Sequence, residues 1–274
     1  MRVVVTGGSG KAGRAVVDNL RAHGHDVLSI DVKGKPGEGS QIVDVCDFGQ
    51  TVECLAGADA VVHLAAIPAP GFFTEETTFR TNITSTFNVF EAARILELER
   101  VVWASSETVF GLPFDEPPLA TPLDEDSPPR PETSYALAKL LGEEMGRQFA
   151  RRTGIPAVAL RFSNIMEPHD YERFPTFWDD PQVRRWNVWS YVDVRDVAQS
   201  CRLALAAPLE GAEVFAIAAA DSVMNRPSDE LMGEVFPTTR HTPVPTPFAT
   251  LMSIGKAQRL LGYEPAHSWR DAVS

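Results

Sequence analysis

A glycine-rich turn close to the N-terminus constrains this chain more than any other feature. It runs from Thr6 to Gly13, follows the apolar run Arg2–Thr6 and opens an amphipathic stretch. Glycines in GxGxxG and GxxGxxG spacing allow a tight turn, close approach of the backbone to a pyrophosphate, and close packing of helix on strand. The strand before the turn and the helix after it supply the required context. The turn therefore predicts a dinucleotide phosphate cradle, with a plain structural turn as the alternative. Its candidate contacts are Gly7, Gly10, Lys11, Ala12 and Gly13.

An acidic residue follows at the end of the next apolar run. A carboxylate at Asp31 would accept hydrogen bonds from the adenosine ribose hydroxyls and repel a 2′-phosphate, which favours NAD over NADP. Lys33 and Lys35 weaken this preference without reversing it. Asp44 and Val45, after a third short strand, are candidates to meet the adenine, although a solvated acid explains Asp44 almost as well.

Apolar, β-branched runs alternate with helical patterns through the first two-thirds of the 274 residues. This alternation predicts an α/β fold with a doubly wound parallel sheet covered on both faces. Strands are expected at Arg2–Thr6, Asp26–Ile30, Ala60–Ala65, Arg100–Ser105 and Pro156–Arg161. Helices are expected at about residues 12–22, 75–98 and 133–152.

The pattern changes after Arg161. Residues 163–191 are rich in aromatic side chains and punctuated by prolines, which indicates irregular structure. A helix (Val194–Ala206), a strand (Glu213–Ala219) and a tail with short helices follow. We expect residues 1–162 and 192–219 to form the dinucleotide-binding domain. Residues 163–191 and 220–274 would form a small, discontinuous C-terminal cap, with most of its aromatic rings in the cap's own core.

Charge and cysteine content exclude several classes of function. Twenty-five basic against 37 acidic residues give a net charge of −12, which disfavours nucleic acids and anionic membranes as partners. The three cysteines, Cys46, Cys54 and Cys201, lack the spacing of a zinc site or a disulfide framework, so we expect no metal and a reducing, cytoplasmic location. No targeting or membrane-spanning segment is apparent.

Two further segments carry the chemistry of a hydroxyl and a proton acceptor. Tyr135 and Lys139 lie at i and i+4 on one helix face, where the lysine charge and a positive nicotinamide ring would lower the phenol pKa from about 10. The segment Ser105–Gly111 ends a strand, at the edge where open α/β sheets bind ligands. A hydroxyl there could hold a substrate oxygen while Tyr135 takes its proton. A serine that only caps the next element is the alternative.

With these motifs together, the chain resembles the extended short-chain dehydrogenase/reductases, the NAD-dependent epimerase/dehydratase group, which have a Rossmann sheet. The resemblance extends to His63–Ala66, Arg161–Asn164, Tyr191–Ala198 and Lys256–Tyr263. It implies that Ser106, Tyr135 and Lys139 form the catalytic triad. It also implies that Leu64, Ala65 and Ala66 line the nicotinamide ribose, that Asn82 lies beneath the active site, and that Asn164 lies beside the substrate. A homodimer is expected by resemblance alone.

Departures from the group narrow the substrate class. Its dehydratases carry an Asp-Glu pair where this chain has Glu107 and Thr108, which we take as substrate contacts beside Ser106. Pro168–Arg173 resembles the segment in which uronate dehydrogenases of the group place an arginine on the substrate carboxylate. Arg173 is therefore a candidate substrate contact, with an ordinary surface arginine as an equal alternative. His63 is expected to be a core histidine.

The leading hypothesis is an NAD-dependent dehydrogenase that transfers hydride between a sugar or sugar acid and NAD. The alternative is a nucleotide-sugar epimerase of the UDP-hexose 4-epimerase type, although Asn187 stands where those enzymes often have a diphosphate-binding arginine. A redox-sensing binding protein on the same fold ranks last, because such relatives usually lack the Tyr135 and Lys139 pair.

Overall fold

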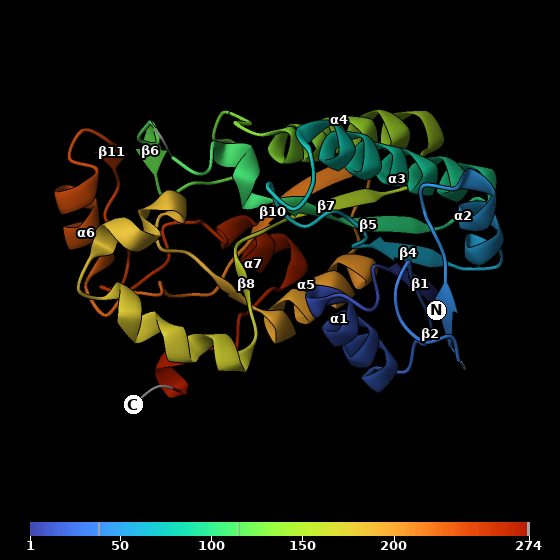
Figure 1. Ribbon diagram of the computed structural model, residues 1–274, viewed down its shortest axis with the longest axis horizontal. Helices are drawn as coiled ribbons and strands as arrows, with labels where there is room; N and C mark the ends of the chain where they lie inside the picture. The colour runs from blue at the N-terminus through green and yellow to red at the C-terminus, as the bar shows by residue number, and fades with distance from the viewer. Residues whose placement is uncertain (38, 115, 273–274) are drawn as a thin grey trace.

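The computed structural model describes residues 1–37, 39–114 and 116–272. Its centre is a seven-stranded parallel sheet in the order β10-β7-β5-β4-β1-β2-β3 (Figure 1). The chain starts in the middle of this order and builds outward in both directions, which is the doubly wound arrangement predicted from the sequence. The strands are β1 (Arg2–Thr6), β2 (Asp26–Asp31), β3 (Ser40–Ile42), β4 (Ala60–His63), β5 (Arg100–Ser106), β7 (Ala157–Phe162) and β10 (Ala212–Ile217).

Helices cover both faces of the sheet (Figure 1). On one face α1 (Lys11–Ala22) packs against α5 (Val194–Ala206), and on the other α3 (Glu75–Ile95) packs against α2 (Phe48–Leu55) and α4 (Ser134–Thr153). Alternate residues of each strand feed the two cores: Val3 and Val5 join the core that contains α1 and α5, and Val4 joins the other. Because both of their faces are buried, the central strands β1 and β4 are mostly apolar, as the sequence indicated.

The predicted strands and long helices are confirmed to within a few residues. The strand expected at Ala60–Ala65 ends earlier, at His63. Beyond His63 the amide of Leu64 still bonds the Thr6 carbonyl, but the amide of Ala65 bonds the Thr6 hydroxyl instead of a neighbouring strand. Helix α2 was not predicted; its sequence signal is Asp47, whose side chain accepts the amide of Gln50 as an N-cap.

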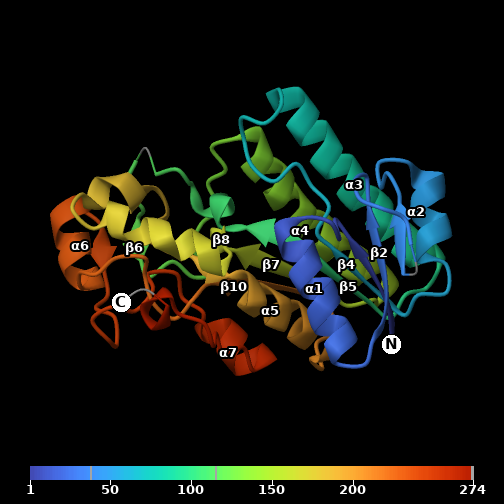
Figure 2. The same ribbon diagram turned by 60° about the horizontal axis from the view of Figure 1, so that its bottom comes forward.

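Beyond the carboxyl ends of the strands, irregular segments form the other end of the molecule (Figure 2). The stretch 163–191 contains β8 (Ile165–Met166) and two 3₁₀ segments, η2 (Pro168–Phe177) and η3 (Pro181–Asn187). After β9 (Val192–Asp193), the tail supplies α6 (Ser228–Val235), β11 (Arg240–His241), α7 (Gly255–Leu261) and η4 (Trp269–Asp271). Proline at the start of each long 3₁₀ segment explains why no strand forms there.

Of two further features at this end of the molecule, the sequence predicted only the second. Strand β6 (Ala120–Thr121) pairs with β11, so a segment from the first part of the chain also lies among the tail elements. The aromatic side chains pack on one another as expected: the ring of the buried Phe174 lies 5.4 Å from that of Tyr191 and 6.0 Å from that of Trp269. Among the described residues, no helix is long and apolar enough to cross a membrane.

Candidate active site

The glycine-rich turn leaves no room for side chains. Gly7 has φ +70°, and a Cβ there would lie 2.7 Å from the amide nitrogen of Ala65. A Cβ on Gly13 would lie 2.0 Å from the carbonyl oxygen of Gly7. Gly10 caps the N-terminus of α1 without any side-chain hydrogen bond, which leaves the first amides of the helix free for an anion. Ala12 follows in the first turn of α1. The turn therefore fits the pyrophosphate of a dinucleotide.

Asp31 lies at the end of β2, directly beside this turn. Its carboxylate accepts hydrogen bonds from the amides of Ser9, at 3.0 Å, and Lys33, at 3.0 Å. These bonds hold the carboxylate in place and leave lone pairs for two ribose hydroxyls. Asp44, in contrast, is exposed and accepts the amide of Cys46, while Val45 is buried. Asp31 is therefore better placed for a contact with the ribose than Asp44 is for a contact with any ligand.

Lys11 does not turn toward the glycine loop. Its Nζ lies 2.7 Å from a carboxylate oxygen of Asp170 and 3.3 Å from the carbonyl oxygen of Ile165, both beyond the sheet. The side chain thus crosses from the start of α1 to η2. The expectation of a simple phosphate contact for Lys11 gives way to a linking position between the cofactor turn and the far end of the molecule.

The segment after β4 is held by buried polar contacts. The side chain of Asn82 on α3 accepts the amide of Ile67 at 2.7 Å and donates to its carbonyl at 3.0 Å. Asn82 therefore fixes the backbone beyond Leu64, Ala65 and Ala66, which are half-buried. His63 is buried, contacts Thr6 and Thr86, and has a pKa lowered by burial to about 3, so it is a neutral core histidine, as expected.

Ser106, Tyr135 and Lys139 come together from different elements. Ser106 ends β5, and Tyr135 and Lys139 occupy the first two turns of α4. The Ser106 hydroxyl lies near enough to the phenol of Tyr135 to lower its pKa. The Nζ of Lys139 lies 5.6 Å from the centre of the tyrosine ring and donates to the carbonyl of Ala104 at 2.8 Å. The side chain of Thr133 accepts a hydrogen bond from the amide of Ala136 and so caps the N-terminus of α4. This cap fixes the start of the helix and with it the position of Tyr135.

Burial sets the protonation of this group. It raises the pKa of Tyr135 to about 12, and the hydrogen bond from Ser106 opposes the rise. It also lowers the pKa of Lys139 to about 8. Burial therefore outweighs the effect of Ser106 on the Tyr135 pKa, and the lowering expected from Lys139 together with a positive nicotinamide ring stays a prediction.

Two hydrogen bonds to the Ser106 oxygen restrict the direction of its hydroxyl hydrogen. Its oxygen accepts hydrogen bonds from the amide of Thr108, at 3.2 Å, and from the Thr108 hydroxyl, at 3.0 Å. With both lone pairs engaged, the serine hydroxyl donates toward Tyr135 and whatever oxygen lies beside it. Thr108 thus orients the Ser106 hydroxyl.

Glu107 faces the protein interior. Its Oε2 accepts a hydrogen bond of 2.6 Å from Ser163, and its Oε1 accepts one of 3.2 Å from Asn187. Burial raises its pKa to about 7, and the nearby Arg184 charge opposes the rise. The cavity-lining residues do not include Glu107. Glu107 thus joins η1 (Glu107–Phe110) to η3, and its contact with substrate stays a prediction.

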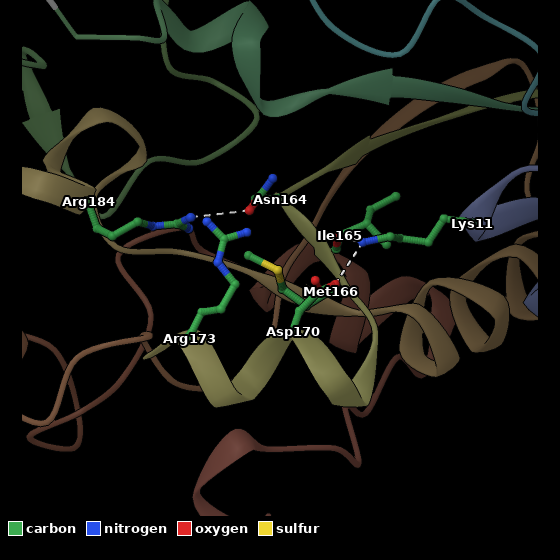
Figure 3. A pocket seen from close by; sticks show the side chains of 7 residues that line it. All are labelled: Lys11, Asn164, Ile165, Met166, Asp170, Arg173 and Arg184. Atoms are coloured by element: carbon green, nitrogen blue, oxygen red, sulfur yellow. Dashed lines mark hydrogen bonds and ion pairs between the residues drawn. The ribbon is translucent and has the colours of Figure 1, made fainter. Parts of the chain in front are cut away.

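A cavity of about 200 Å³ opens beyond the carboxyl ends of the strands (Figure 3). Its walls come from α1, β8 and both 3₁₀ segments, and Asn164 lies two residues after Phe162, the partner of Ser106 in the sheet. Seven residues line it: Lys11, Asn164, Ile165, Met166, Asp170, Arg173 and Arg184. Asn164 and Arg173, singled out from the sequence, are thus placed around one space.

Arg184 is the lining residue that sequence reasoning missed. Its guanidinium is buried, donates to Asn164 Oδ1 at 3.3 Å and to the carbonyl of Ser190 at 3.1 Å, and has a pKa lowered by burial to about 10. No local pattern marks this residue, because its position depends on how η3 folds back on β8.

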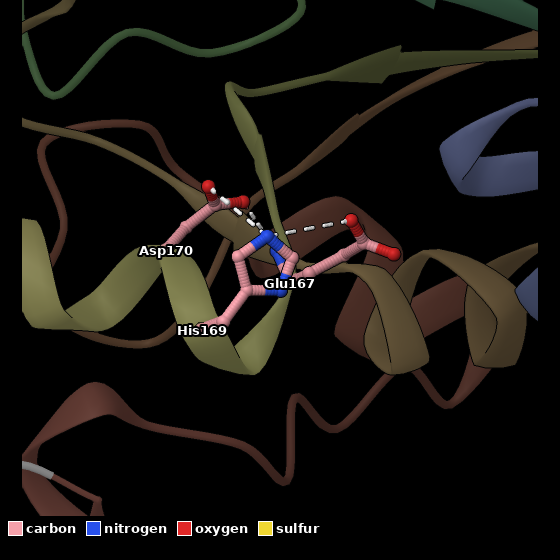
Figure 4. Close-up of side chains that lie close together, drawn as sticks. All are labelled: Glu167, His169 and Asp170. Atoms are coloured by element: carbon pink, nitrogen blue, oxygen red, sulfur yellow. Dashed lines mark hydrogen bonds and ion pairs between the residues drawn. The ribbon is translucent and has the colours of Figure 1, made fainter.

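Glu167, His169 and Asp170 form an acidic cluster at the start of η2 (Figure 4). Asp170 pairs with Lys11, and Glu167 pairs with Arg14 at 3.2 Å. His169 is exposed and lies 3.8–3.9 Å from both carboxylates. The two ion pairs account for the carboxylates: they tie η2 to α1 across the glycine turn.

The family model for the NAD dependent epimerase/dehydratase family matches residues 3–218. Among curated proteins, the chain is 32% identical to an L-arabinose 1-dehydrogenase (NAD(P)(+)) of Haloferax volcanii, covering 76% of this chain and 84% of that protein. It is 29% identical to a uronate dehydrogenase of Pseudomonas syringae pv. tomato, covering 78% and 84%. A solved UDP-galactose 4-epimerase is 27% identical, with a TM-score of 0.72 over 100% of this chain and 96% of that one.

Proposed function

Because the chain belongs to the NAD dependent epimerase/dehydratase family and is an NAD-dependent enzyme, we propose that it oxidises a free sugar or sugar acid at a ring hydroxyl, the anomeric one in the first instance. The observation that carries this proposal is Arg173. Its side chain lies in the cavity beyond the catalytic strand ends, and its guanidinium has no ion-pair partner within the described part of the chain. A guanidinium in that position suits the carboxylate of a sugar acid.

Each group of the site has a place in this chemistry. Bound NAD⁺ supplies the hydride acceptor. Ser106, with its oxygen engaged by Thr108, donates a hydrogen bond to the substrate hydroxyl oxygen. Tyr135, as its phenolate, takes the hydroxyl proton and becomes the neutral phenol while the substrate carbon gives up its hydride, and the positive Lys139 near the ring favours the phenolate that starts this step. Asn164 is suited to hydrogen-bond the sugar from the cavity wall.

The surroundings of Asn187 support a free sugar over a nucleotide sugar. Asn187, four residues before Tyr191, is buried and bound to Glu107 and the Ser190 carbonyl, so it offers nothing to a diphosphate. We also propose that residues 163–191 and the tail act together as a small cap over the substrate.

The test is a panel of reducing sugars. The purified chain is incubated with NAD⁺ and with D-glucuronate, D-galacturonate, L-arabinose, D-galactose or D-glucose, and reduced cofactor is followed by absorbance. We expect reduction with at least one sugar and formation of its lactone. If UDP-galactose is isomerised instead, with no net reduced cofactor, the chain is an epimerase, the activity named for the solved structure it matches over its whole length. No turnover of either kind would contradict the proposal.

We further propose a cytoplasmic homodimer that pairs through α3 and α4. Support comes from apolar side chains left exposed on these two helices: Phe87 and Ile95 on α3, and Leu137 and Leu141 on α4. Light scattering should give twice the chain mass, and Phe87→Glu should give a monomer. The three cysteines are free, which is consistent with a reducing compartment.

A further inference from the structure

Arg184 is a buried cation with incomplete partners. Two of its guanidinium nitrogens donate to Asn164, Asn187 and the Ser190 carbonyl. Its Nε is buried and has no hydrogen-bond partner in the described part of the chain. A buried donor without an acceptor is costly, so it indicates an acceptor that the protein itself does not provide.

A second guanidinium lies beside it. Arg173 lines the same cavity, and Figure 3 shows its guanidinium on the same side of the cavity as that of Arg184. The two charges are close enough for Arg173 to lower the pKa of Arg184 further. Two guanidinium groups side by side repel each other unless an anion lies between them.

The neighbouring acids do not fill this role. Asp170 is held by Lys11 at 2.7 Å, and Glu107 is bound by Ser163 and Asn187 outside the cavity wall. Aromatic rings also hold Arg184 rigid: its guanidinium carbon lies 4.7 Å from the centre of the Trp186 ring and 5.3 Å from that of Phe177. Arg184 is therefore already oriented, whereas Arg173 is exposed and has no ion-pair partner within the described part of the chain.

We propose that Arg184 and Arg173 form a two-arginine subsite that binds an oxyanion of the sugar substrate, either a carboxylate or a phosphate. Arg184 is its buried, oriented member and Arg173 its exposed member. The subsite lies away from the hydroxyl held by Ser106 and Tyr135. This inference rests on the proposed function, which it narrows from sugars in general to anionic sugars. A bidentate oxyanion bridges the two guanidinium groups and accepts from the buried Nε.

The experiment compares sugars that differ only in the anion. Values of KM are measured at saturating NAD⁺ for D-glucuronate, D-glucose 6-phosphate and D-glucose, with the wild type and with Arg184→Lys, Arg184→Gln and Arg173→Gln. Arg185→Gln is the matched control, because Arg185 is the next residue of η3 but bonds Gln182 at the surface. We expect each of the first three changes to raise KM for the anionic sugar about 10- to 100-fold, with D-glucose changed less than about twofold. Arg185→Gln should change neither.

A binding measurement distinguishes failure of the two-arginine subsite from failure of the proposed function. Calorimetric titration of the cofactor-free protein with D-glucuronate and D-glucose 6-phosphate needs no turnover. Loss of this binding in Arg184→Lys supports the subsite even if no sugar is oxidised, and the anion that binds more tightly identifies its chemistry. Should Arg184→Gln fail to fold, Arg184→Lys, which keeps the charge but not the planar fork, decides. Wild-type affinity in Arg184→Lys, or no preference of the wild type for either anionic sugar over D-glucose, would overturn the inference.

Discussion

Tyr135 and Lys139 occupy successive turns of α4, and both side chains are buried. Burial moves their pKa values apart, to about 12 for the phenol and about 8 for the ammonium. Burial favours the uncharged form of each group, because the interior penalises either charge. The phenolate that can accept a proton therefore forms more readily when a further positive charge lies beside the ring.

We expect Tyr135→Phe to lower kcat about 10²- to 10⁴-fold, the usual contribution of a positioned acid or base. The phenylalanine ring keeps the packing over Lys139, so NAD⁺ affinity should stay within about twofold of the wild type by calorimetry. Steady-state rates with the best sugar of the panel provide the measurement. Activity retained in this variant would show that another group accepts the proton.

Glu107 gives a prediction for stability against pH. Its pKa is raised from 4.5 in the unfolded chain to about 7 in the folded protein. Between these values the unfolded state releases the proton while the folded state keeps it, so stability falls as pH rises. The loss begins near pH 4.5, is complete above about pH 7 and amounts to about 3 kcal/mol.

Glu107→Gln removes this titration while keeping the size of the side chain. Urea unfolding of both proteins at pH 5 and pH 8 should show that the variant gains about 2–3 kcal/mol relative to the wild type at the higher pH. A difference between the two proteins that is the same at both pH values would mean that the carboxyl does not titrate in this range.

At the scale of elements, the join between β1 and α1 is the most demanding. The backbone of Gly7 lies against the segment after β4, and α1 approaches so closely that Gly13 touches the Gly7 carbonyl. At Gly7 and Gly13 the neighbouring atoms belong to the backbone, so no side chain could move aside for an added methyl group. The turn is both the phosphate cradle and a packing contact.

Gly13→Ala should therefore weaken NAD⁺ binding at least about tenfold and destabilise the fold by about 1–3 kcal/mol, since the new methyl group meets backbone rather than a movable side chain. Gly233→Ala is the control: Gly233 lies in α6, is exposed and has nothing within 4 Å of an added Cβ. There, higher helix propensity should stabilise by up to about 1 kcal/mol. Calorimetry and thermal melts measure both; equal effects of the two changes would refute the steric argument.

For the whole molecule, we expect the dinucleotide to bind where the glycine turn, β2 and the segment after β4 converge. The pairs Lys11–Asp170 and Arg14–Glu167 tie η2 to α1 beside this place. Ligand that binds only the folded chain stabilises all of it by mass action. Since two amides hold the Asp31 carboxylate beside the glycine turn, we expect it to discriminate between the two cofactors.

We expect NAD⁺ at 100 times its dissociation constant to stabilise the fold by about 2.7 kcal/mol, which raises Tm by about 5–10 °C for a chain of this size. NADP⁺ at the same concentration should give a clearly smaller rise, and Asp31→Ser should narrow the gap. Differential scanning calorimetry decides; an equal rise with both cofactors in the wild type would remove Asp31 from the cofactor preference.

By itself the sequence determined what local rules can encode: apolar β-branched strands, the glycine turn whose function needs the absence of side chains, and the i, i+4 spacing that places Tyr135 over Lys139. Only the tertiary structure decided which way long polar side chains turn. Glu107 turned inward to Ser163 and Asn187, Lys11 reached Asp170, and Arg184 entered the cavity wall. The positions of Glu107 and Lys11 depend on partners 56 to 159 residues distant along the chain, and all three depend on burial costs that exist only once the segments are packed together.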